Sequence, residues 1–169
     1  MEIPSGSIAI WDERHSMANF APVPVTLFST SENALRVATA EQLYQVCKFL
    51  PRETHIRHAI VTAKSPSQAK EVASEHKSAI RRDWSDIQKK VMYGVIRMKL
   101  RQNPDVQQEL IETGNAYIYE DADQYAPSNP TPEEVRSMRR WGIYEGEGEN
   151  LIGEMLMDMR AQIIEHGKL

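Results

Sequence analysis

Beyond residue 38, apolar residues recur at intervals of three and four positions, which is the spacing of one buried face of a helix. The first such segment begins at Thr39, which forms with Gln42 a T-x-x-Q pattern typical of a capping box, and Pro51 ends it. Its predicted buried stripe consists of Leu43, Val46, Cys47 and Leu50. The pattern therefore predicts a short, capped helix just before Pro51.

The same spacing predicts further helices, each with a recognisable start. Ser65–Pro66 begins one that continues to about His76, and a longer one follows Trp84. The core-facing positions predicted for this longer helix are Ile87, Val91, Val95 and Met98. The remaining helices are expected to begin at Asn103–Pro104 (ending at a left-handed cap, Thr113–Gly114), at Thr131–Glu134, and at Asn150, which caps a helix to about His166.

Three short runs are typical of β-strands. SIAIW (residues 7–11) and PVPVTLF (residues 22–28) are rich in β-branched residues and are bounded by prolines and small polar residues. AYIYE (residues 116–120) alternates between apolar and polar positions. The polar, proline-rich segment 124–134 is expected to be a surface insertion. These patterns predict a predominantly helical α+β fold with a few short strands, in a single domain over residues 1–169.

Composition narrows the class of protein. A chain of 169 residues is long enough for one domain with a sizeable core. No segment has the roughly 20 apolar residues of a membrane span, and the N-terminus lacks the pattern of a secretion signal. Cys47 is the only cysteine, which excludes an internal disulfide and favours a reducing, cytoplasmic location. The net charge of −4 argues against a surface that coats nucleic acid broadly, although it is compatible with a local basic patch.

The first predicted helix places an acid and a base on one face. Glu41, Tyr44, Gln45 and Lys48 share a strip opposite the apolar stripe, and Glu41 and Lys48 lie about 10 Å apart along the helix axis. Because helical side chains lean towards the N-terminus, Lys48 can reach back towards Glu41. The ordinary interpretation is two solvated charges that complement the helix dipole, each contributing about 0.3–1 kcal/mol. Spacing alone favours this interpretation over a catalytic pair.

Several short motifs along the chain occur in a fixed order. They are ANFAP (Ala18–Pro22), TAEQLYQVCKF (Thr39–Phe49), Ser65–Pro66 with Ala69–Lys70, RRDW (Arg81–Trp84), Val91–Met92, Lys99, Thr113–Gly114, Glu120, Trp141–Gly142 and GENLIG (Gly148–Gly153). Their order and spacing resemble the NADAR family, named for a predicted connection with NAD and ADP-ribose chemistry. The resemblance extends from about Asn19 to Gln162, so the chain is similar to one NADAR-like domain with an N-terminal extension, residues 1–16.

This resemblance implies an N-glycosidase, a hydrolase that acts on the bond between ribose C1 and an amino nitrogen. Substrate types known in the family are ADP-ribose attached to guanine and a ribosylamino-pyrimidine phosphate related to riboflavin synthesis. The implied partner is therefore a nucleotide or an ADP-ribosylated nucleic acid. No cofactor and no membrane are implied, and neither the released base nor the oligomeric state is predicted.

The resemblance makes Glu41 and Lys48 the expected catalytic residues. Breaking the C1–N bond builds positive charge at C1, which a carboxylate such as Glu41 can stabilise while it activates water. Lys48 would either orient Glu41 or form a Schiff base with ring-opened ribose, a route that requires a neutral amine. Expected substrate-binding residues are Asn19, Tyr44, Gln45, Arg81, Trp84, Lys99, Glu120, Trp141, Gly142 and Asn150.

These binding residues each have an ordinary alternative. Tryptophans such as Trp84 and Trp141 commonly serve as large core residues instead of stacking on a base. Arg81 and Lys99 suit phosphate groups but equally suit a solvated helix surface. Asn150 is expected to cap its helix in either case, and such a helix end also favours phosphate.

The chain departs from the family at two places. An aspartate common before the W-G pair is replaced by Ser137–Arg140, so Glu120, Asp121 or Asp123 would have to supply that carboxylate. Position 149, often lysine in the family, is Glu149, which makes the loop 145–149 acidic and unfavourable for phosphate unless nearby arginines compensate. A substrate unlike the familiar ones is consistent with both changes.

Other functional classes have less support from the sequence. The histidines lack zinc-ligand spacing, and neither a nucleophile elbow nor a phosphate-binding glycine loop is present. The main alternative is a module that binds ADP-ribose or a nucleotide without cleaving it, which would not need both Glu41 and Lys48. A helical interaction protein, with its Glu41 face covered by a partner, is the third hypothesis.

Overall fold

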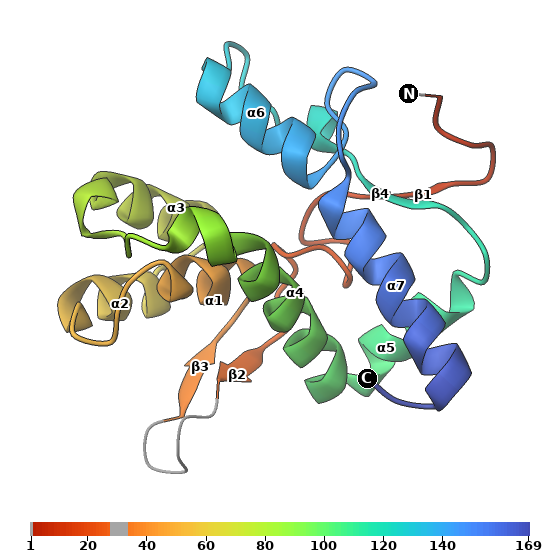
Figure 1. Ribbon diagram of the computed structural model, residues 1–169, viewed down its shortest axis with the longest axis horizontal. Helices are drawn as coiled ribbons and strands as arrows, with labels where there is room; N and C mark the ends of the chain where they lie inside the picture. Colours follow the sequence, from red (N-terminus) through yellow and green to blue (C-terminus); the bar gives the residue numbers. More distant parts are fainter. Residues whose placement is uncertain (1, 28–33) are drawn as a thin grey trace. The chain divides into compact units, whose positions relative to one another are not determined.

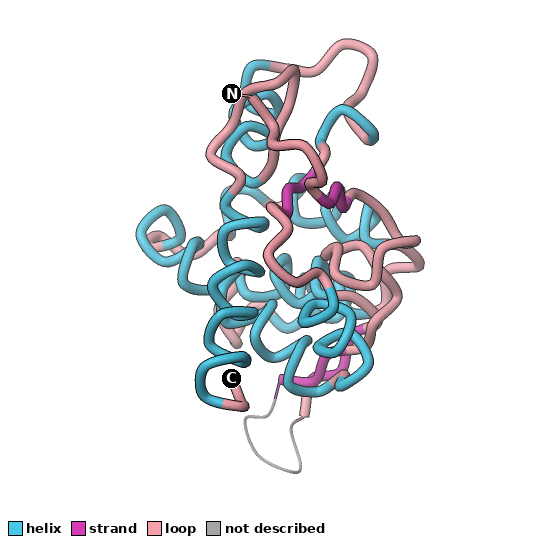
Figure 2. Tube along the Cα trace, turned by 90° about the vertical axis from the view of Figure 1, so that its right-hand side faces the viewer, coloured by secondary structure: helices cyan, strands magenta, loops and turns pink. Residues whose placement is uncertain are grey.

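The computed structural model describes residues 2–27 and 34–169. By its internal contacts the chain divides into two compact units. One, the central unit, consists of residues 19–103, and the other, the terminal unit, consists of residues 1–18 and 104–169. Helices dominate both units, and strands occur only as two short pairs among the described residues (Figure 2). The prediction of a mostly helical α+β fold is confirmed, and the single-domain prediction stays a prediction.

The central unit consists of a small hairpin and four helices (Figure 1). Strands β2 (Val25–Leu27) and β3 (Leu35–Val37) pair antiparallel. The sequence predicted the first of these strands and missed the second, and Phe28 of the predicted run lies outside the described residues. The helices are α1 (Ala40–Cys47), α2 (Thr54–Val61), α3 (Pro66–Glu75) and α4 (Trp84–Gln102), with a short 3₁₀ helix, η1 (Lys77–Ala79), between α3 and α4.

Helix α1 begins where the capping pattern predicts and is buried on nearly all sides. The Thr39 hydroxyl accepts a hydrogen bond from the Gln42 backbone N–H, and the Gln42 side-chain oxygen accepts one from the Thr39 backbone N–H. Leu43 and Val46 of the predicted stripe are completely buried, whereas Cys47 and Leu50 are only partly buried. The polar positions Glu41 and Gln45 of the opposite face are buried as well. The interpretation of that face as two solvated charges is therefore wrong for Glu41. Neighbouring helices pack on α1 from more than one side, which periodicity cannot reveal.

Two other predictions for the central unit need correction. Helix α2 was not predicted, because its charged sequence hides the two buried positions Ile56 and Ile60. In α4, the predicted stripe is displaced by one residue. The fully buried positions are Met92, Val95, Ile96, Lys99 and Leu100. Only Val95 of the expected set is fully buried, and the buried set includes the charged residue Lys99.

The terminal unit pairs the start of the chain with its second half. Strand β1 (Ile8–Ile10) lies parallel to β4 (Ile118–Glu120), with Ile8 opposite Ile118. The helices of this unit are α5 (Pro104–Glu112), α6 (Pro132–Trp141) and α7 (Leu151–His166), with a short 3₁₀ helix, η2 (Ala122–Gln124), after β4. All four predicted elements after residue 103 are present. Helix α7 packs against α5 and β4 (Figure 1).

The ends of these helices follow the expected chemistry with one exception. Gly114 adopts the predicted left-handed conformation after α5, and Thr131 with Glu134 forms a capping box at α6. Asn150 precedes α7 but has left-handed backbone angles, and its side chain makes no capping hydrogen bond. The prediction that the Asn150 side chain caps α7 is therefore wrong. Among the described residues, none of the helices has the length and apolar character required to cross a membrane.

Candidate functional site

Helix α1 places a buried carboxylate beside a buried amide. Glu41 is 6% exposed, and its backbone N–H donates to the carbonyl oxygen of Asn19 over 3.0 Å. One turn later, the Gln45 side chain donates its Nε2 hydrogen bond to Glu41 Oε1 over 2.6 Å. A carboxylate that is buried and held by a single amide is kept in one orientation while retaining acceptor capacity. Glu41 is thus held in one orientation at this face of α1.

Two amide oxygens near Glu41 have unused hydrogen-bonding capacity. Because a carboxylate only accepts hydrogen bonds, the Gln45 amide must turn its nitrogen towards Glu41 and its oxygen away. The Asn19 side chain donates to Met92 Sδ over 3.2 Å. Gln45 Oε1 and Asn19 Oδ1 are buried, and neither accepts a hydrogen bond from the described residues. Buried acceptors are normally satisfied, so a water molecule or a ligand would supply the donor for each of these two oxygens.

Lys48 follows the last residue of α1 and lies against two aromatic rings. Its ammonium nitrogen is 5.5 Å from the ring centre of Tyr44 and 6.0 Å from that of Trp84. The two rings lie 5.1 Å apart and are tilted by 56°. Contact with aromatic faces favours a cation at this place and limits the directions in which the side chain can extend. Tyr44 and Trp84 therefore form an aromatic wall around a half-buried Lys48.

The backbone of Lys48 connects this group to the start of α4. The Arg81 N–H donates to the Lys48 carbonyl oxygen over 2.9 Å. The Arg81 guanidinium makes two hydrogen bonds to the Asp83 carboxylate, of 2.7 and 2.8 Å. This pairing raises the pKa of Arg81 and lowers the pKa of Asp83. Sequence reasoning missed Asp83, although the R-x-D spacing immediately before a helix was visible.

Two further titratable residues of the central unit, Lys99 and Cys47, are at least partly buried. Lys99 is 1% exposed, so the interpretation as a solvated helix charge is wrong, and its contact with a ligand stays a prediction. Burial raises the pKa of the Cys47 thiol, which keeps it protonated and unreactive at neutral pH. The described residues contain no group of three histidine, cysteine or carboxylate side chains placed to hold a metal ion. The chemistry available at this face is that of Glu41 and Lys48.

The other predicted residues lie in the terminal unit, where they support the backbone. The Asn150 amide donates to the carbonyl oxygen of Ile118 over 2.8 Å and to the Tyr117 hydroxyl over 3.1 Å. Its oxygen accepts the backbone N–H of Glu120 over 3.1 Å. Gly142 lies so close to Glu120 that any side chain there would collide with the Glu120 backbone and Cβ. Asn150, Glu120 and Gly142 are therefore brought together by the fold, with Asn150 joining β4 to the start of α7.

The remaining terminal residues define an acidic loop. Arg139 makes ion pairs with Glu145, at 3.3 Å, and Glu147, at 2.8 Å. Arg140 lies 5.6 Å from the ring centre of Trp141, which ends α6. Arg139, one of the nearby arginines expected to offset the charge of the acidic loop, is thus paired with two carboxylates of that loop. Of the candidate carboxylates, Asp121 accepts the backbone N–H of Asp123, and Asp123 accepts the backbone N–H of Glu145 in the acidic loop. Glu120 is buried at the end of β4.

Comparison with known proteins identifies the family. The profile of the NADAR domain matches residues 9–164, which is nearly the whole chain. The chain belongs to the NADAR family. The predicted resemblance is confirmed, and the T-x-E…Y-Q…K-F segment of the NADAR pattern corresponds here to α1 with its buried Glu41 and Gln45.

Several relatives have informative names. The NADAR chain is 29% identical to a riboflavin biosynthesis protein of Vibrio vulnificus (strain YJ016), over 92% of this chain and 37% of that protein. It is 27% identical to the chloroplastic riboflavin biosynthesis protein PYRR of Zea mays, over 91% of this chain and 24% of that one. The chain thus spans little more than a third and about a quarter of these two relatives. It is 25% identical to the N-glycosidase YbiA of Escherichia coli (strain K12), over 90% and 83% of the two chains.

A solved structure shows the same NADAR fold. The NMR structure of E. coli YbiA matches this chain with a TM-score of 0.74 at 22% sequence identity. The match covers 98% of this chain and 90% of YbiA. At this identity the similarity establishes the fold, and the chemistry has to be argued from the side chains.

Proposed function

We propose that this protein is an N-glycosidase that hydrolyses a bond between ribose C1 and an amino nitrogen. Membership of the NADAR family and the names of its relatives support this reaction class. The observation that carries the proposal is the α1 face, where a buried carboxylate held by Gln45 and an amine against two aromatic rings come from one short helix. A structural helix gains little by burying Glu41 with one amide partner, because desolvating a carboxylate costs several kcal/mol.

In the proposed reaction, Glu41 accepts a proton from water as the water oxygen bonds to C1. The C1–N bond breaks, and its electron pair stays on the nitrogen, which takes up a proton and leaves as an amine. Positive charge that develops at C1 is stabilised by the nearby Glu41 carboxylate. The substrate ribose supplies the hydroxyl donors that Gln45 Oε1 and Asn19 Oδ1 lack in the protein alone.

Lys48 has two candidate roles in this scheme. As an ammonium it balances the charge of Glu41 and protonates the departing nitrogen. As a neutral amine it adds to C1 of the ring-opened ribose, the substrate nitrogen takes up a proton and leaves as an amine, and water then hydrolyses the imine between C1 and Lys48 to return the lysine. Borohydride reduction during turnover distinguishes these roles, because only the second leaves ribose covalently attached to the protein.

For the substrate, we propose ADP-ribose attached to guanine, with a ribosylamino-pyrimidine phosphate as the alternative. The test is incubation of the protein with each compound, followed by chromatographic measurement of the released base and sugar. Release of either base supports the glycosidase. Binding of ADP-ribose without release of a base from either compound would contradict the glycosidase and favour the non-catalytic binding module.

A further inference from the structure

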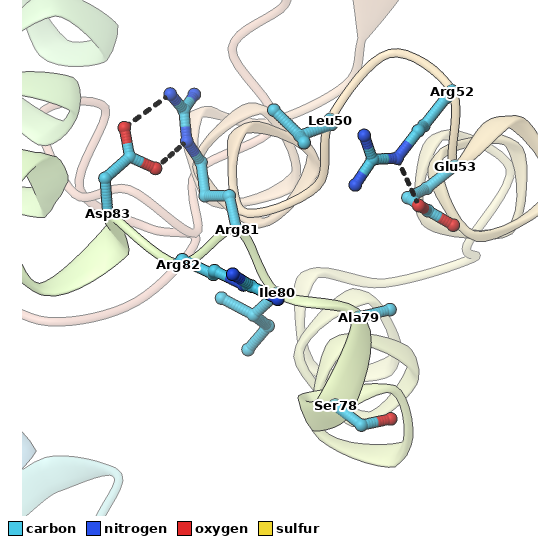
Figure 3. Close-up of a pocket in the computed structure, with 9 residues that line it drawn as sticks. All are labelled: Leu50, Arg52, Glu53, Ser78, Ala79, Ile80, Arg81, Arg82 and Asp83. Carbon is cyan, nitrogen blue, oxygen red and sulfur yellow. Dashed lines mark hydrogen bonds and ion pairs between the residues drawn. The ribbon is translucent and has the colours of Figure 1, made fainter.

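A second feature of the central unit is an open pocket of about 640 Å³, which includes Arg81 and Asp83 but not Glu41. It lies between the connection that follows α1 and the segment that joins η1 to α4 (Figure 3). The residues that line it are Leu50, Arg52, Glu53, Ser78, Ala79, Ile80, Arg81, Arg82 and Asp83. Its volume is in the range of pockets that accept nucleotide-sized groups.

The three arginines of this pocket differ in how firmly they are engaged. Arg81 is held by two hydrogen bonds to Asp83. Arg52 has one hydrogen bond to Glu53, at 3.2 Å, and its side chain is 77% exposed, so this pair contributes little and separates easily. Arg82 is exposed and makes no hydrogen bond or ion pair with the described residues, and Figure 3 draws no contact for it. Arg52 and Arg82 are therefore available to bind an anion.

The net charge of the whole central unit indicates what kind of anion would bind to this pocket. Residues 19–103 contain fourteen lysines and arginines and seven aspartates and glutamates, a net charge of +7. Within the pocket itself, three arginines face two carboxylates, which leaves only one excess positive charge. One such charge at an exposed site binds a single phosphate weakly. A polymer of phosphates gains more, because it contacts several exposed cations at once and releases their counterions.

We infer that this pocket, here called the Arg82 pocket, binds the phosphate backbone of a nucleic acid, with Arg82 and Arg52 as the contacting residues. Lys89 and Lys90, on the first half of α4, are two further exposed cations of the central unit. This inference rests on the proposed function for its biological meaning, since the Arg81–Lys48 backbone bond places the pocket next to the proposed catalytic lysine. The inference therefore favours a base within a nucleic acid over a free nucleotide as the substrate of the proposed glycosidase.

The test measures binding apart from catalysis. Full-length protein is titrated into a fluorescein-labelled 12-nucleotide single-stranded DNA or RNA without ADP-ribose, and anisotropy is followed between 50 and 300 mM salt. Contacts of Arg82 and Arg52 with two phosphates predict a slope of log K against log salt of about −1.4, since each phosphate contributes about −0.7 on single strands. Arg82→Ala is expected to weaken binding roughly three- to tenfold and to reduce the slope by about 0.7.

The matched control is Arg136→Ala, which removes an exposed arginine from α6 in the terminal unit. Equal affinity of the two variants would overturn the inference, and so would AMP that displaces the oligonucleotide at equal concentrations of phosphate. Both substitutions are at exposed positions, and circular dichroism checks that the fold is retained. Glu41→Gln separates the two proposals. The Glu41→Gln variant is expected to bind the oligonucleotide normally and to show no turnover. If the wild-type protein turns over substrate but Arg82→Ala leaves oligonucleotide binding unchanged, the inference about the Arg82 pocket is wrong and the proposed glycosidase function stands.

Discussion

The two units of this protein differ in net charge and in how the buried amide side chains of the family pattern are hydrogen-bonded. The central unit has a net charge of +7, whereas the terminal unit has six basic and seventeen acidic residues, a net charge of −11. In the central unit, buried polar groups around Glu41 retain unsatisfied acceptors. In the terminal unit, the buried amide of Asn150 makes three hydrogen bonds to its surroundings.

This difference divides the residues of the NADAR pattern into a group expected to take part in the reaction and a group expected to support the fold. Residues of the NADAR pattern in α1 are buried with capacity left over, which is the state expected of groups that await a ligand. Asn150 and Gly142, equally part of the pattern, are occupied by their own backbone surroundings. The first group is expected to affect activity when substituted, and the second group is expected to affect stability.

The largest expected effect is on turnover. Lys48→Ala and Glu41→Gln are each predicted to reduce the rate by roughly 10³-fold or more, which corresponds to about 4 kcal/mol in the activation free energy. The melting temperature should change little in either variant. The measurement is initial rates of base release together with thermal unfolding, with Lys64→Ala, an exposed residue, as control. Near-normal rates in both variants would remove the catalytic assignment.

The next effect is on stability and comes from α7. Gly153→Ala places a methyl group against the carbonyl oxygen of Ile118 and the side-chain amide of Asn150. Because that contact involves backbone and a buried amide, the strand or helix must move, and we expect destabilisation of about 3 kcal/mol. Denaturant unfolding measures it. Gly94→Ala in α4, where a Cβ meets no atom within 4 Å, is the control and should be neutral or slightly stabilising.

Asn150→Ala tests the structural role of the Asn150 hydrogen bonds, with a smaller expected loss of stability than Gly153→Ala. It leaves the Ile118 carbonyl oxygen and the Glu120 N–H, both buried, without this partner. The expected loss is about 2–3 kcal/mol in the free energy of unfolding. Asn150→Asp should also destabilise, because a carboxylate cannot donate to the Ile118 oxygen. If either variant instead lost turnover at full stability, Asn150 would belong to the site.

Trp84→Phe examines the aromatic wall. The smaller ring keeps an apolar face but weakens the contact with the Lys48 ammonium. We expect KM to rise by about two- to fivefold with a smaller change in kcat, since stacking energy is lost in both ground and transition states. Trp11→Phe in the terminal unit, remote in sequence from this wall, is the comparison. Equal kinetics of the two variants would show that Trp84 serves only packing.

The smallest effect concerns pH. The pKa of Asp83 is lowered below its ordinary value of 3.8 by the Arg81 hydrogen bonds. A carboxyl whose pKa is lower in the folded state contributes stability that is present above pH 3.8 and is lost as pH falls through the lower value. Because the pair is solvent-exposed, the change in stability should be slight. A carboxyl NMR titration that gave an ordinary pKa for Asp83 would contradict the pairing.

The helix starts and the order of elements were predictable because they depend on neighbouring residues. Thr39 with Gln42 and Thr131 with Glu134 form the capping boxes that their spacing indicates. Helix α2 was missed, because its two buried isoleucines lie among histidines and an arginine. The side-chain role of Asn150 was wrong, because its partners lie about thirty residues earlier in the chain.

The sequence by itself determined the family, the mostly helical fold and the presence of Glu41 and Lys48 on one short helix, since these follow from local pattern and motif order. Tertiary structure alone decided that Glu41 and Gln45 are buried, that Lys48 lies against Tyr44 and Trp84, and that Arg52 and Arg82 line one pocket. Burial and pairing depend on which distant segments pack together, and no local spacing contains that information.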